Sequence, residues 1–437
     1  MTKPSVRQLI AENTLSQMAA TVVSLGFGLV TAAVLSRYLG VERFGKFNYL
    51  FAFYYFFLAL NDLGINTVVV RELSQKKHPS GEVLGSVFLF KLALSLFSLG
   101  VAWAIVFWMG FEGDFRRGLL LYGLILPLLT LQLPTVLYQV HLKLARLSVL
   151  SVINKGIALA FTLTAVWLRF GITGLAIALV LAEAFYAFLL FRDARPLIEP
   201  DWKWNSRVVR GIFHSGIPIG FTGFLVAVIN RSSFILLERF QDLHQLGLFS
   251  AATKVTAILE TLPLTVMGTL YPLMSRYAAE DPSRLKSLHQ KSSFSLASIG
   301  LAAAVSVSFA SPLLIRVIFG RAYLAAAPIL AVLVWATAFL YAAICSGSLL
   351  ISLGCEKINL GITLAAAPLN VLLNLRLIPR WGALGSAWAA VITYGFILIC
   401  ALAAANRSLQ AKNKNRPPST PFYASLKTWW PWEKLSA

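Results

Sequence analysis

The sequence is dominated by twelve long apolar runs, each close to or above the length that a helix needs to cross a lipid bilayer. A spanning helix takes about 20 predominantly apolar residues. A backbone inside lipid must also satisfy its own hydrogen bonds, which a helix does within one segment. We therefore predict an all-α integral membrane protein with about twelve transmembrane helices. The predicted spans are 15–36, 47–70, 83–108, 118–140, 147–168, 173–191, 212–236, 246–274, 294–314, 325–352, 358–378 and 383–404.

The charge distribution predicts how these spans are oriented. Only 13% of the residues are charged, against about 25% in soluble domains. An even number of spans places both termini on one side, and the loops on that side hold about twice as many lysines and arginines as the others. By the positive-inside rule we expect both termini to be cytoplasmic, in a multi-pass protein of the cell inner (plasma) membrane. The net charge of +20 is then explained by loops that face anionic lipid, so no nucleic-acid partner is expected.

An internal repeat predicts two lobes. Residues 169–178 read RFGITGLAIA and residues 380–389 read RWGALGSAWA, while Phe44-Gly45 is echoed by Leu246-Gly247. Because six spans separate the repeats, both halves have the same orientation and are related by a pseudo-two-fold axis along the membrane normal. Such a pair can enclose a central cavity. The predicted division is an N-terminal lobe at 1–191, a cytoplasmic linker at 192–211, a C-terminal lobe at 212–404 and a cytoplasmic tail at 405–437.

Ionisable residues inside the predicted spans are the candidates for a functional site. Each costs about 2.5–3.5 kcal/mol at the bilayer centre, so each must face a protein partner or a wet cavity. Arginine and lysine in such a cavity attract phosphate or pyrophosphate, although Lys91 could also snorkel to the surface. The acids could couple transport to an ion or could form structural ion pairs. The bases are Lys91, Lys155, Arg231 and Lys254, and the acids are Asp62, Glu183 and Glu260.

Polar amides accompany these charges. Asn154 and Asn230 directly precede two of the intramembrane bases, where their amides could meet sugar hydroxyls or could hydrogen-bond between helices. The sequence has no Walker A motif, no G-x-S-x-G and no H-E-x-x-H. We therefore expect no catalytic residue, no cofactor and no metal site, and a protein that is not an enzyme.

Three stretches carry a family resemblance. They are Asn13-Thr14-Leu15 with the following VLSRYLGVERFGKFNYLFAF, then NDLGINTVVVREL, and then PLNVLLNLRLIPRWGALGSAWAAVITY from Pro368 to Tyr394. The chain resembles the Wzx-type polysaccharide-biosynthesis and O-antigen flippases of the multidrug/oligosaccharidyl-lipid/polysaccharide exporter superfamily. Relatives often have an acid near one point of the seventh span, where this chain has Asn230-Arg231.

The resemblance implies a MATE-like fold and a transport function. It implies that a polyprenyl-pyrophosphate-linked oligosaccharide is moved from the cytoplasmic to the outer leaflet by alternating access, for the synthesis of cell-surface polysaccharide such as lipopolysaccharide. It further implies H⁺ or Na⁺ as a coupling ion, a polysaccharide polymerase as a partner, and Arg231 as a ligand of the lipid pyrophosphate.

Two other functions are considered. A cation-coupled multidrug exporter of the same superfamily would favour acids over bases in its cavity. A polytopic polysaccharide polymerase or ligase would need a large external loop, and the predicted external loops are short.

Overall fold

The computed structural model describes residues 6–75, 80–197 and 204–414, and within these ranges the chain forms helices and connecting turns but no strand. This confirms the predicted all-α class. The helices of the first half are α1 (Val6–Asp62), α2 (Ile65–Ser74), α3 (Ser80–Trp108), α4 (Gly113–Tyr122), α5 (Ile125–Thr130), α6 (Thr135–Val140), α7 (Leu144–Trp167), α8 (Ile172–Ala194) and the 3₁₀ turn η1 (Arg195–Leu197). Those of the second half are α9 (Ser206–Phe240), α10 (Leu243–Glu280), α11 (Pro282–Ile318), the 3₁₀ helix η2 (Arg321–Ala326), α12 (Ala327–Ser352) and α13 (Glu356–Lys414).

The helices account for the twelve predicted spans. In the described part of the chain, nine segments are long and apolar enough to cross a membrane. Two of these each contain a pair of predicted spans, because α1 reverses direction at Gly40 (φ 70°) and α13 reverses at Gly382 (φ 56°). Only glycine adopts such backbone angles without strain. The fourth predicted span falls on α4, α5 and α6.

The fourth span is where the sequence-based prediction of one continuous helix over 118–140 is wrong. Pro134 has no N–H group, so it cannot bond to the carbonyl oxygen of Thr130. That oxygen instead accepts from the N–H of Leu133, three residues along, and the N–H of Gln132 likewise bonds to Leu129. The helix therefore tightens into 3₁₀-like turns and crosses as three short pieces.

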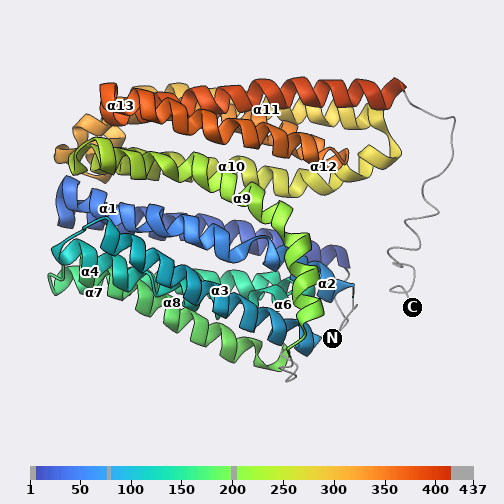
Figure 1. Cartoon of the computed structure of the whole chain (residues 1–437). Coiled ribbons are helices and arrows are strands. Elements are labelled where there is room, and N and C mark those ends of the chain that lie inside the picture. Colours follow the sequence, from blue (N-terminus) through green and yellow to red (C-terminus); the bar gives the residue numbers. More distant parts are fainter. Residues whose placement is uncertain (1–5, 76–79, 198–203, 415–437) are drawn as a thin grey trace.

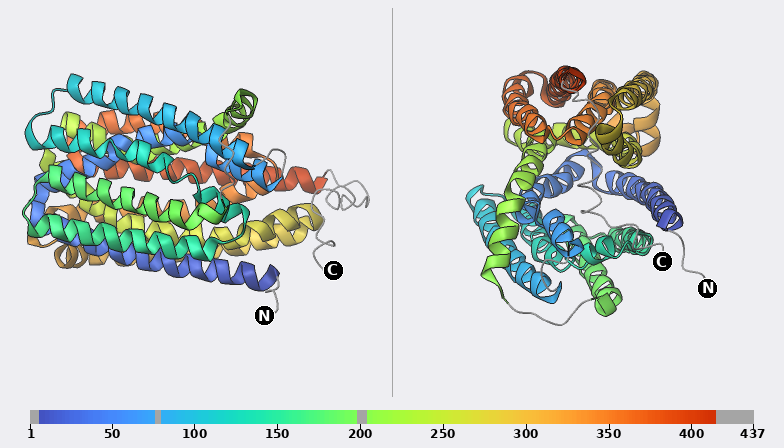
Figure 2. Two further views of the ribbon diagram at one scale, coloured as in Figure 1. Left: turned by 90° about the horizontal axis from the view of Figure 1, so that it is seen from below. Right: turned by 90° about the vertical axis from the view of Figure 1, so that its right-hand side faces the viewer.

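The two halves of the chain form two groups of helices that are joined by α9. Helices α1–α8 lie on one side and α10–α13 on the other (Figures 1 and 2). The first turns of α9 pack against the N-terminal group, where Val208 and Ile212 join the cluster of Ile65 and Val83. Its later turns, including Ile229, pack against α13. The linker predicted at 192–211 therefore includes packed helix at its end, and its residues 198–203 lie outside the described part of the chain.

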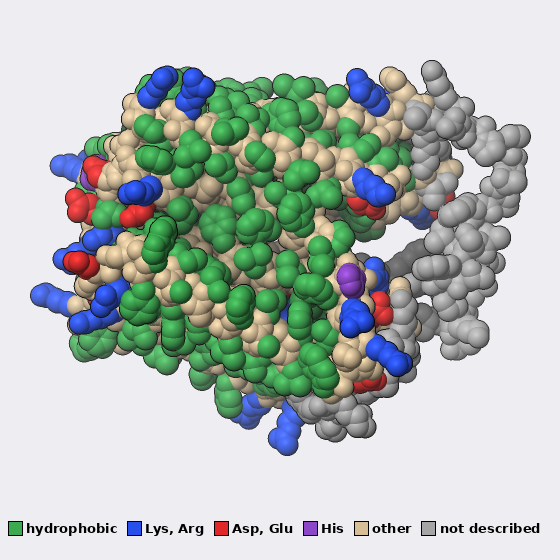
Figure 3. All heavy atoms as spheres, in the orientation of Figure 1, with side chains coloured by type: hydrophobic (Ala, Val, Ile, Leu, Met, Phe, Trp, Pro, Cys, Tyr) green, Lys and Arg blue, Asp and Glu red, His purple; other side chains and the backbone are tan. Residues whose placement is uncertain are grey.

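The molecule has an apolar middle and charged ends. Figure 3 shows hydrophobic side chains over the middle of the surface, while most Lys, Arg, Asp and Glu side chains gather towards the two ends. Helix α1 begins and α13 ends at the same end of the bundle (Figure 1). We call this the terminal end and the opposite one the far end. The predicted tail is helical as far as Lys414, and residues 415–437 lie outside the described part.

The two groups are closed against each other at the far end. Arg37 of α1 donates a hydrogen bond to the carbonyl oxygen of Val317 (2.7 Å), and Tyr323 of η2 donates to that of Ser36 (3.0 Å). Gly45 of α1 and Gly247 of α10 lie backbone to backbone. These are the two glycines of the sequence repeat, so the repeat places them at equivalent positions on either side of the seam.

The terminal end is open by comparison. The first half of α1 stands away from α10, with Leu15 66% and Val22 69% exposed, and an added Cβ at Gly26 would meet no atom within 4 Å. Figure 3 shows the outline hollowed between the groups at this end. The groups therefore meet at the far end and separate towards the terminal end.

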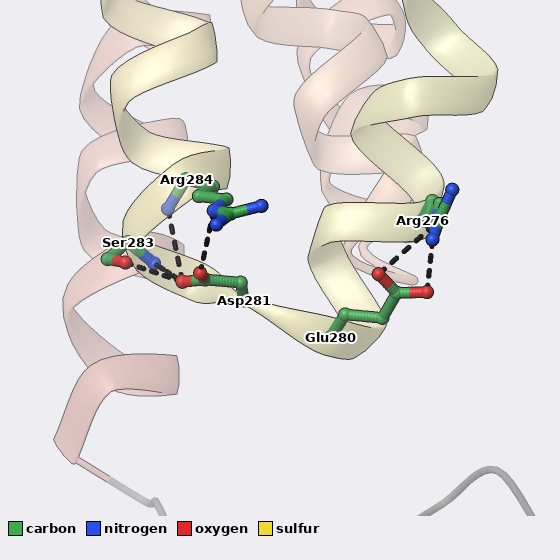
Figure 4. A network of polar contacts seen from close by, with 5 residues as sticks. All are labelled: Arg276, Glu280, Asp281, Ser283 and Arg284. Atoms are coloured by element: carbon green, nitrogen blue, oxygen red, sulfur yellow. Dashed lines mark hydrogen bonds and ion pairs between the residues drawn. The ribbon is translucent and has the colours of Figure 1, made fainter.

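Helices α10 and α11 are joined at the terminal end by a short polar turn (Figure 4). Asp281 accepts hydrogen bonds from the backbone N–H groups of Ser283 and Arg284, which caps α11, and Arg276 pairs with Glu280 one turn away on α10. An N-terminal aspartate cap satisfies helix N–H groups that have no partner within the helix. The turn thus fixes where α10 ends and α11 begins.

Candidate functional site

Three of the predicted bases come together at the seam between the two groups. Lys155 lies on α7, Arg231 on α9 and Lys254 on α10. The charges of Arg231 and Lys155 both act on Lys254. Helices from both halves therefore supply one cationic site, which we call the seam cluster.

Aromatic rings of α1 and α9 lie beneath two cations of the seam cluster, Arg231 and Lys254. The Arg231 guanidinium lies 4.7 Å from the ring centre of Tyr55 and 5.7 Å from that of Phe234, and the Lys254 ammonium lies 5.4 Å from Phe51. A cation over a ring face is stabilised by the ring's negative face, more strongly where water is excluded. The rings stabilise the half-buried Arg231 and Lys254 without cancelling their charges.

The seam cluster lacks neutralising acids. In the described part of the chain, Lys155, Arg231 and Lys254 form no ion pair, and the Nε atom of Arg231 is buried with no hydrogen-bond partner. Glu260 of α10 acts on Arg231 electrostatically, but without ion-pair contact. The acid near Arg231 therefore leaves the cluster without a direct counter-charge. The residual positive charge of the cluster, together with an unused guanidinium donor, suits an anionic group such as a phosphate or pyrophosphate.

The fourth predicted base, Lys91, lies in a different place. It is buried on α3, and its ammonium donates to Oδ1 of Asn66 (2.9 Å) and forms an ion pair with Asp62 (3.3 Å). The charge that acts on Lys91 comes from Asp62 and not from the seam cluster. The prediction that groups Lys91 with the other three bases as a ligand of one pyrophosphate has no support from this placement.

The remaining predicted residues take part in hydrogen bonds within their own half. Glu183 of α8 accepts from Nε2 of Gln132 (2.8 Å) and from Nδ2 of Asn154 (3.4 Å). Asn230 is exposed, and its side-chain oxygen accepts from the hydroxyl of Tyr394 (2.8 Å). Glu183 is therefore bound by amides and not by a base.

Several residues at the site were not identified from the sequence. Tyr55, Tyr122 and Tyr394 all interact electrostatically with Arg231, yet tyrosine in an apolar run gives no sign that it faces a site. Gln132 could have been noticed as an amide within a predicted span. In the part of the chain that the structure covers, no group of three or more His, Cys, Asp or Glu side chains is placed to hold a metal ion.

An apolar groove runs along the seam. It has a volume of about 320 Å³ and is lined by side chains of α1, α3, α9 and α13. Phe53, Phe56 and Ile105 supply one wall, and Ile235 and Val371 supply the other. Ser232, the neighbour of Arg231 in the chain, also lines it. Lys155, Arg231 and Lys254 do not line it, so the groove is a separate apolar surface of the seam.

Comparison with known proteins gives a family match. The model of a family described as "Polysaccharide biosynthesis protein" matches residues 10–278, which is more than half of the chain. An uncharacterized membrane protein of Methanocaldococcus jannaschii is 24% identical over 236 residues, covering 53% of this chain and 46% of that protein. The match thus spans less than half of that relative's length.

Solved structures share the fold. The lipid II flippase MurJ, in an inward closed conformation, has a TM-score of 0.77 at 12% identity, covering 94% of this chain and 95% of that one. An inward-facing multidrug resistance transporter of the MATE family has a TM-score of 0.73 at 14% identity, covering 92% and 100%. A transporter of the same superfamily from Pyrococcus furiosus has a TM-score of 0.68 at 14% identity, covering 93% and 96%. At these identities the likeness establishes the MATE-like fold alone.

Proposed function

Because this chain belongs to the polysaccharide biosynthesis protein family, we propose that it is a flippase for a polyprenyl-pyrophosphate-linked oligosaccharide. It moves this lipid from the cytoplasmic to the outer leaflet of the plasma membrane, for the synthesis of cell-surface polysaccharide. The observation that carries the proposal is the seam cluster, in which Lys155, Arg231 and Lys254 lie together and form no ion pair in the described part of the chain. The fold shared with a lipid II flippase supports a lipid-linked substrate.

The seam cluster would hold the pyrophosphate. Arg231 offers a planar fork of donors that matches two phosphate oxygens, while the lysines act as compact charges. The apolar groove at the seam would take part of the prenyl chain, because its walls are aromatic and aliphatic. The remaining chain stays in lipid, so only the charged and sugar-bearing part has to cross the bilayer within the protein.

The arrangement of the halves supports alternating access. With the terminal end at the cytoplasm, the observed state is open inwards and closed outwards. The lipid headgroup would enter at the terminal end and bind the seam cluster. Separation at Gly45 and Gly247 would then open the far end. Coupling of this cycle to H⁺ or Na⁺ remains part of the proposal, with Glu183 and Glu260 as the acids available for it.

A multidrug exporter is the weaker candidate. The likeness to MATE transporters is a likeness of fold and does not indicate the same substrate. An organic cation would be repelled by the three bases of the seam cluster.

The test is complementation in cells that lack an O-antigen flippase, scored by surface polysaccharide and by the amount of lipid-linked precursor. We expect the wild type to restore the polysaccharide and lower the precursor. A variant with Lys155→Ala, Arg231→Ala and Lys254→Ala, present at equal abundance, should do neither. Normal export by that variant would overturn the proposed role of the seam cluster.

A further inference from the structure

A second polar pocket lies within the N-terminal group of helices, away from the seam cluster. Its volume is about 230 Å³, and it is enclosed by α1, α2, α3, α5 and the turn before α6. Two breaks in the helices border it. One is Leu63-Gly64 between α1 and α2, where both residues have positive φ, and the other is the 3₁₀-like turn at Gln132. Helix breaks at this depth are tolerated where they line a cavity or are buried in protein.

The pocket contains one charge of each sign, and the two form a pair. Lys91 is 7% exposed and bonds to Asp62 and Asn66, while the side chain of Asp62 is 44% exposed. Because the two charges neutralise each other as a pair, the pocket carries no net charge that would select an anion or a cation. The ligand that suits such a balanced pocket is uncharged.

The pocket also offers a hydrogen-bond donor that nothing in the described chain uses. Asn61 is 6% exposed, and its Oδ1 accepts from the hydroxyl of Ser98 (2.8 Å). Its Nδ2 is buried with no partner. An amide left unpaired in a buried place costs about 1–3 kcal/mol, so a ligand acceptor here would be favourable. Asp62 supplies an accessible acceptor one residue away.

Part of the pocket lining is apolar. Leu58, Leu126 and Leu129 line it together with the amide of Gln132. The pocket thus combines a donor, a carboxylate acceptor and an aliphatic surface within a small volume. A sugar ring has these complementary features, since its hydroxyls donate and accept around the rim and its C–H groups form an apolar face.

We propose that this pocket binds one neutral sugar ring of the transported glycan. This inference rests on the proposed function and extends it, because it separates recognition of the sugar by Asn61 and Asp62 from recognition of the pyrophosphate by the seam cluster. Lys91 is then a positioning residue, whose ion pair holds Asp62 at the pocket.

The test compares two lipids that differ in the sugar. One is the lipid-linked oligosaccharide extracted from membranes of cells that express the chain, and the other is undecaprenyl pyrophosphate. Binding of each to the purified full chain is measured for the wild type, Asn61→Leu and Arg231→Ala. We expect Asn61→Leu to weaken binding of the glycolipid by roughly three- to tenfold without changing binding of undecaprenyl pyrophosphate. Arg231→Ala should weaken both.

Asn48→Leu is the matched control, because Asn48 is a buried asparagine of the same helix whose amide donates to the carbonyl of Phe44 outside the pocket. It should leave binding of both lipids unchanged. Thr130→Val, which removes a buried hydroxyl from the pocket wall, replaces Asn61→Leu if that variant does not fold. Equal binding of the glycolipid by the pocket variant and the wild type, or equal weakening of both lipids, would overturn the sugar site. Failure of the wild type to bind either lipid would instead refute the proposed function.

Discussion

Gly45 and Gly247 lie in direct backbone contact across the seam, and the contact is symmetric. A Cβ on Gly45 would lie 2.7 Å from the carbonyl oxygen of Leu243, and one on Gly247 would lie 2.1 Å from that of Val41. The same sequence offset relates Gly45 to Gly247 and Val41 to Leu243. The two halves therefore meet here as two copies of one surface, with no room for a side chain.

Substitution of Gly247 by valine should open the far end. The valine side chain would meet backbone that cannot move aside, and overpacking of this kind costs about 1–3 kcal/mol. That is enough to shift an equilibrium between closed and open states roughly 5- to 150-fold. Spin labels at the exposed positions Glu42 and Arg321 should move apart in this variant. Gly268→Val on the same helix, where an added Cβ meets no atom within 4 Å, should leave the label distance unchanged. Unchanged distances in both variants would contradict the tight seam.

Arg231→Lys should keep the charge but impair export. Lysine cannot reproduce the fork of donors or the stacking on Tyr55, so about 1.5–3 kcal/mol of charge-assisted hydrogen bonding is at risk. We expect binding of undecaprenyl pyrophosphate to weaken roughly 10-fold or more, measured on purified protein. Arg239→Lys, an exposed position at the end of the same helix, is the control. Full affinity of Arg231→Lys for undecaprenyl pyrophosphate would mean that a positive charge at this position is enough to bind the pyrophosphate.

Asn374→Leu should destabilise the C-terminal group of helices. Asn374 is fully buried, accepts from the hydroxyls of Ser233 (3.2 Å) and Ser386 (2.6 Å), and donates to Asn370 (3.0 Å). Its removal leaves buried hydroxyls without an acceptor, at about 1–3 kcal/mol.

Thermal unfolding in detergent should show a clear loss of stability for Asn374→Leu, and little change for Leu372→Val at a position that is 63% exposed. Unaltered unfolding together with lost transport would assign Asn374 to the substrate instead.

The contribution of Asp193 to stability should disappear in acid. Burial raises the pKa of Asp193, but hydrogen bonds from Arg146 and Tyr138 outweigh this and hold the pKa below its usual 3.8. A depressed carboxyl pKa stabilises the fold above the unfolded pKa, and that stability is lost as the pH falls through the folded value. The effect is small because Arg146 is exposed.

Unfolding of the wild type and Asp193→Asn should therefore differ at neutral pH and converge below pH 3.8. A stability difference between the wild type and Asp193→Asn that grows as the pH falls would contradict a depressed pKa of Asp193.

The fold was predictable because a bilayer imposes length and apolarity on each span. Twelve apolar runs and the repeat around Gly45 and Gly247 predict the helices and their pairing. The break at Pro134 has a local cause, since proline removes one N–H group. However, Pro218 and Pro263 lie inside α9 and α10, which continue past them. Whether a proline bends or breaks a helix depends on the neighbours that satisfy the freed backbone groups.

The sequence predicts which charged residues the candidate site contains, but it does not predict which of them lie together. Intramembrane charges identify Arg231 and Lys254 as unusual, because lipid makes them costly. The sequence does not reveal that Lys91 bonds to both Asp62 and Asn66, since these contacts depend on the packing of α3 against α1 and on the break at Leu63-Gly64 that lies between the two partners. The contacts of Tyr55 with Arg231 depend in the same way on packing between halves that are far apart in the chain.

The most direct test of the account is translocation by the purified protein in liposomes. The lipid-linked oligosaccharide extracted from producing cells is placed in both leaflets, and its exposure to an added glycosidase is followed over time. We expect the wild type to expose the inner-leaflet glycan, while the variant with Lys155→Ala, Arg231→Ala and Lys254→Ala does so no faster than empty liposomes. Equal rates for the wild type and this variant would contradict the claim that the seam cluster carries the pyrophosphate across.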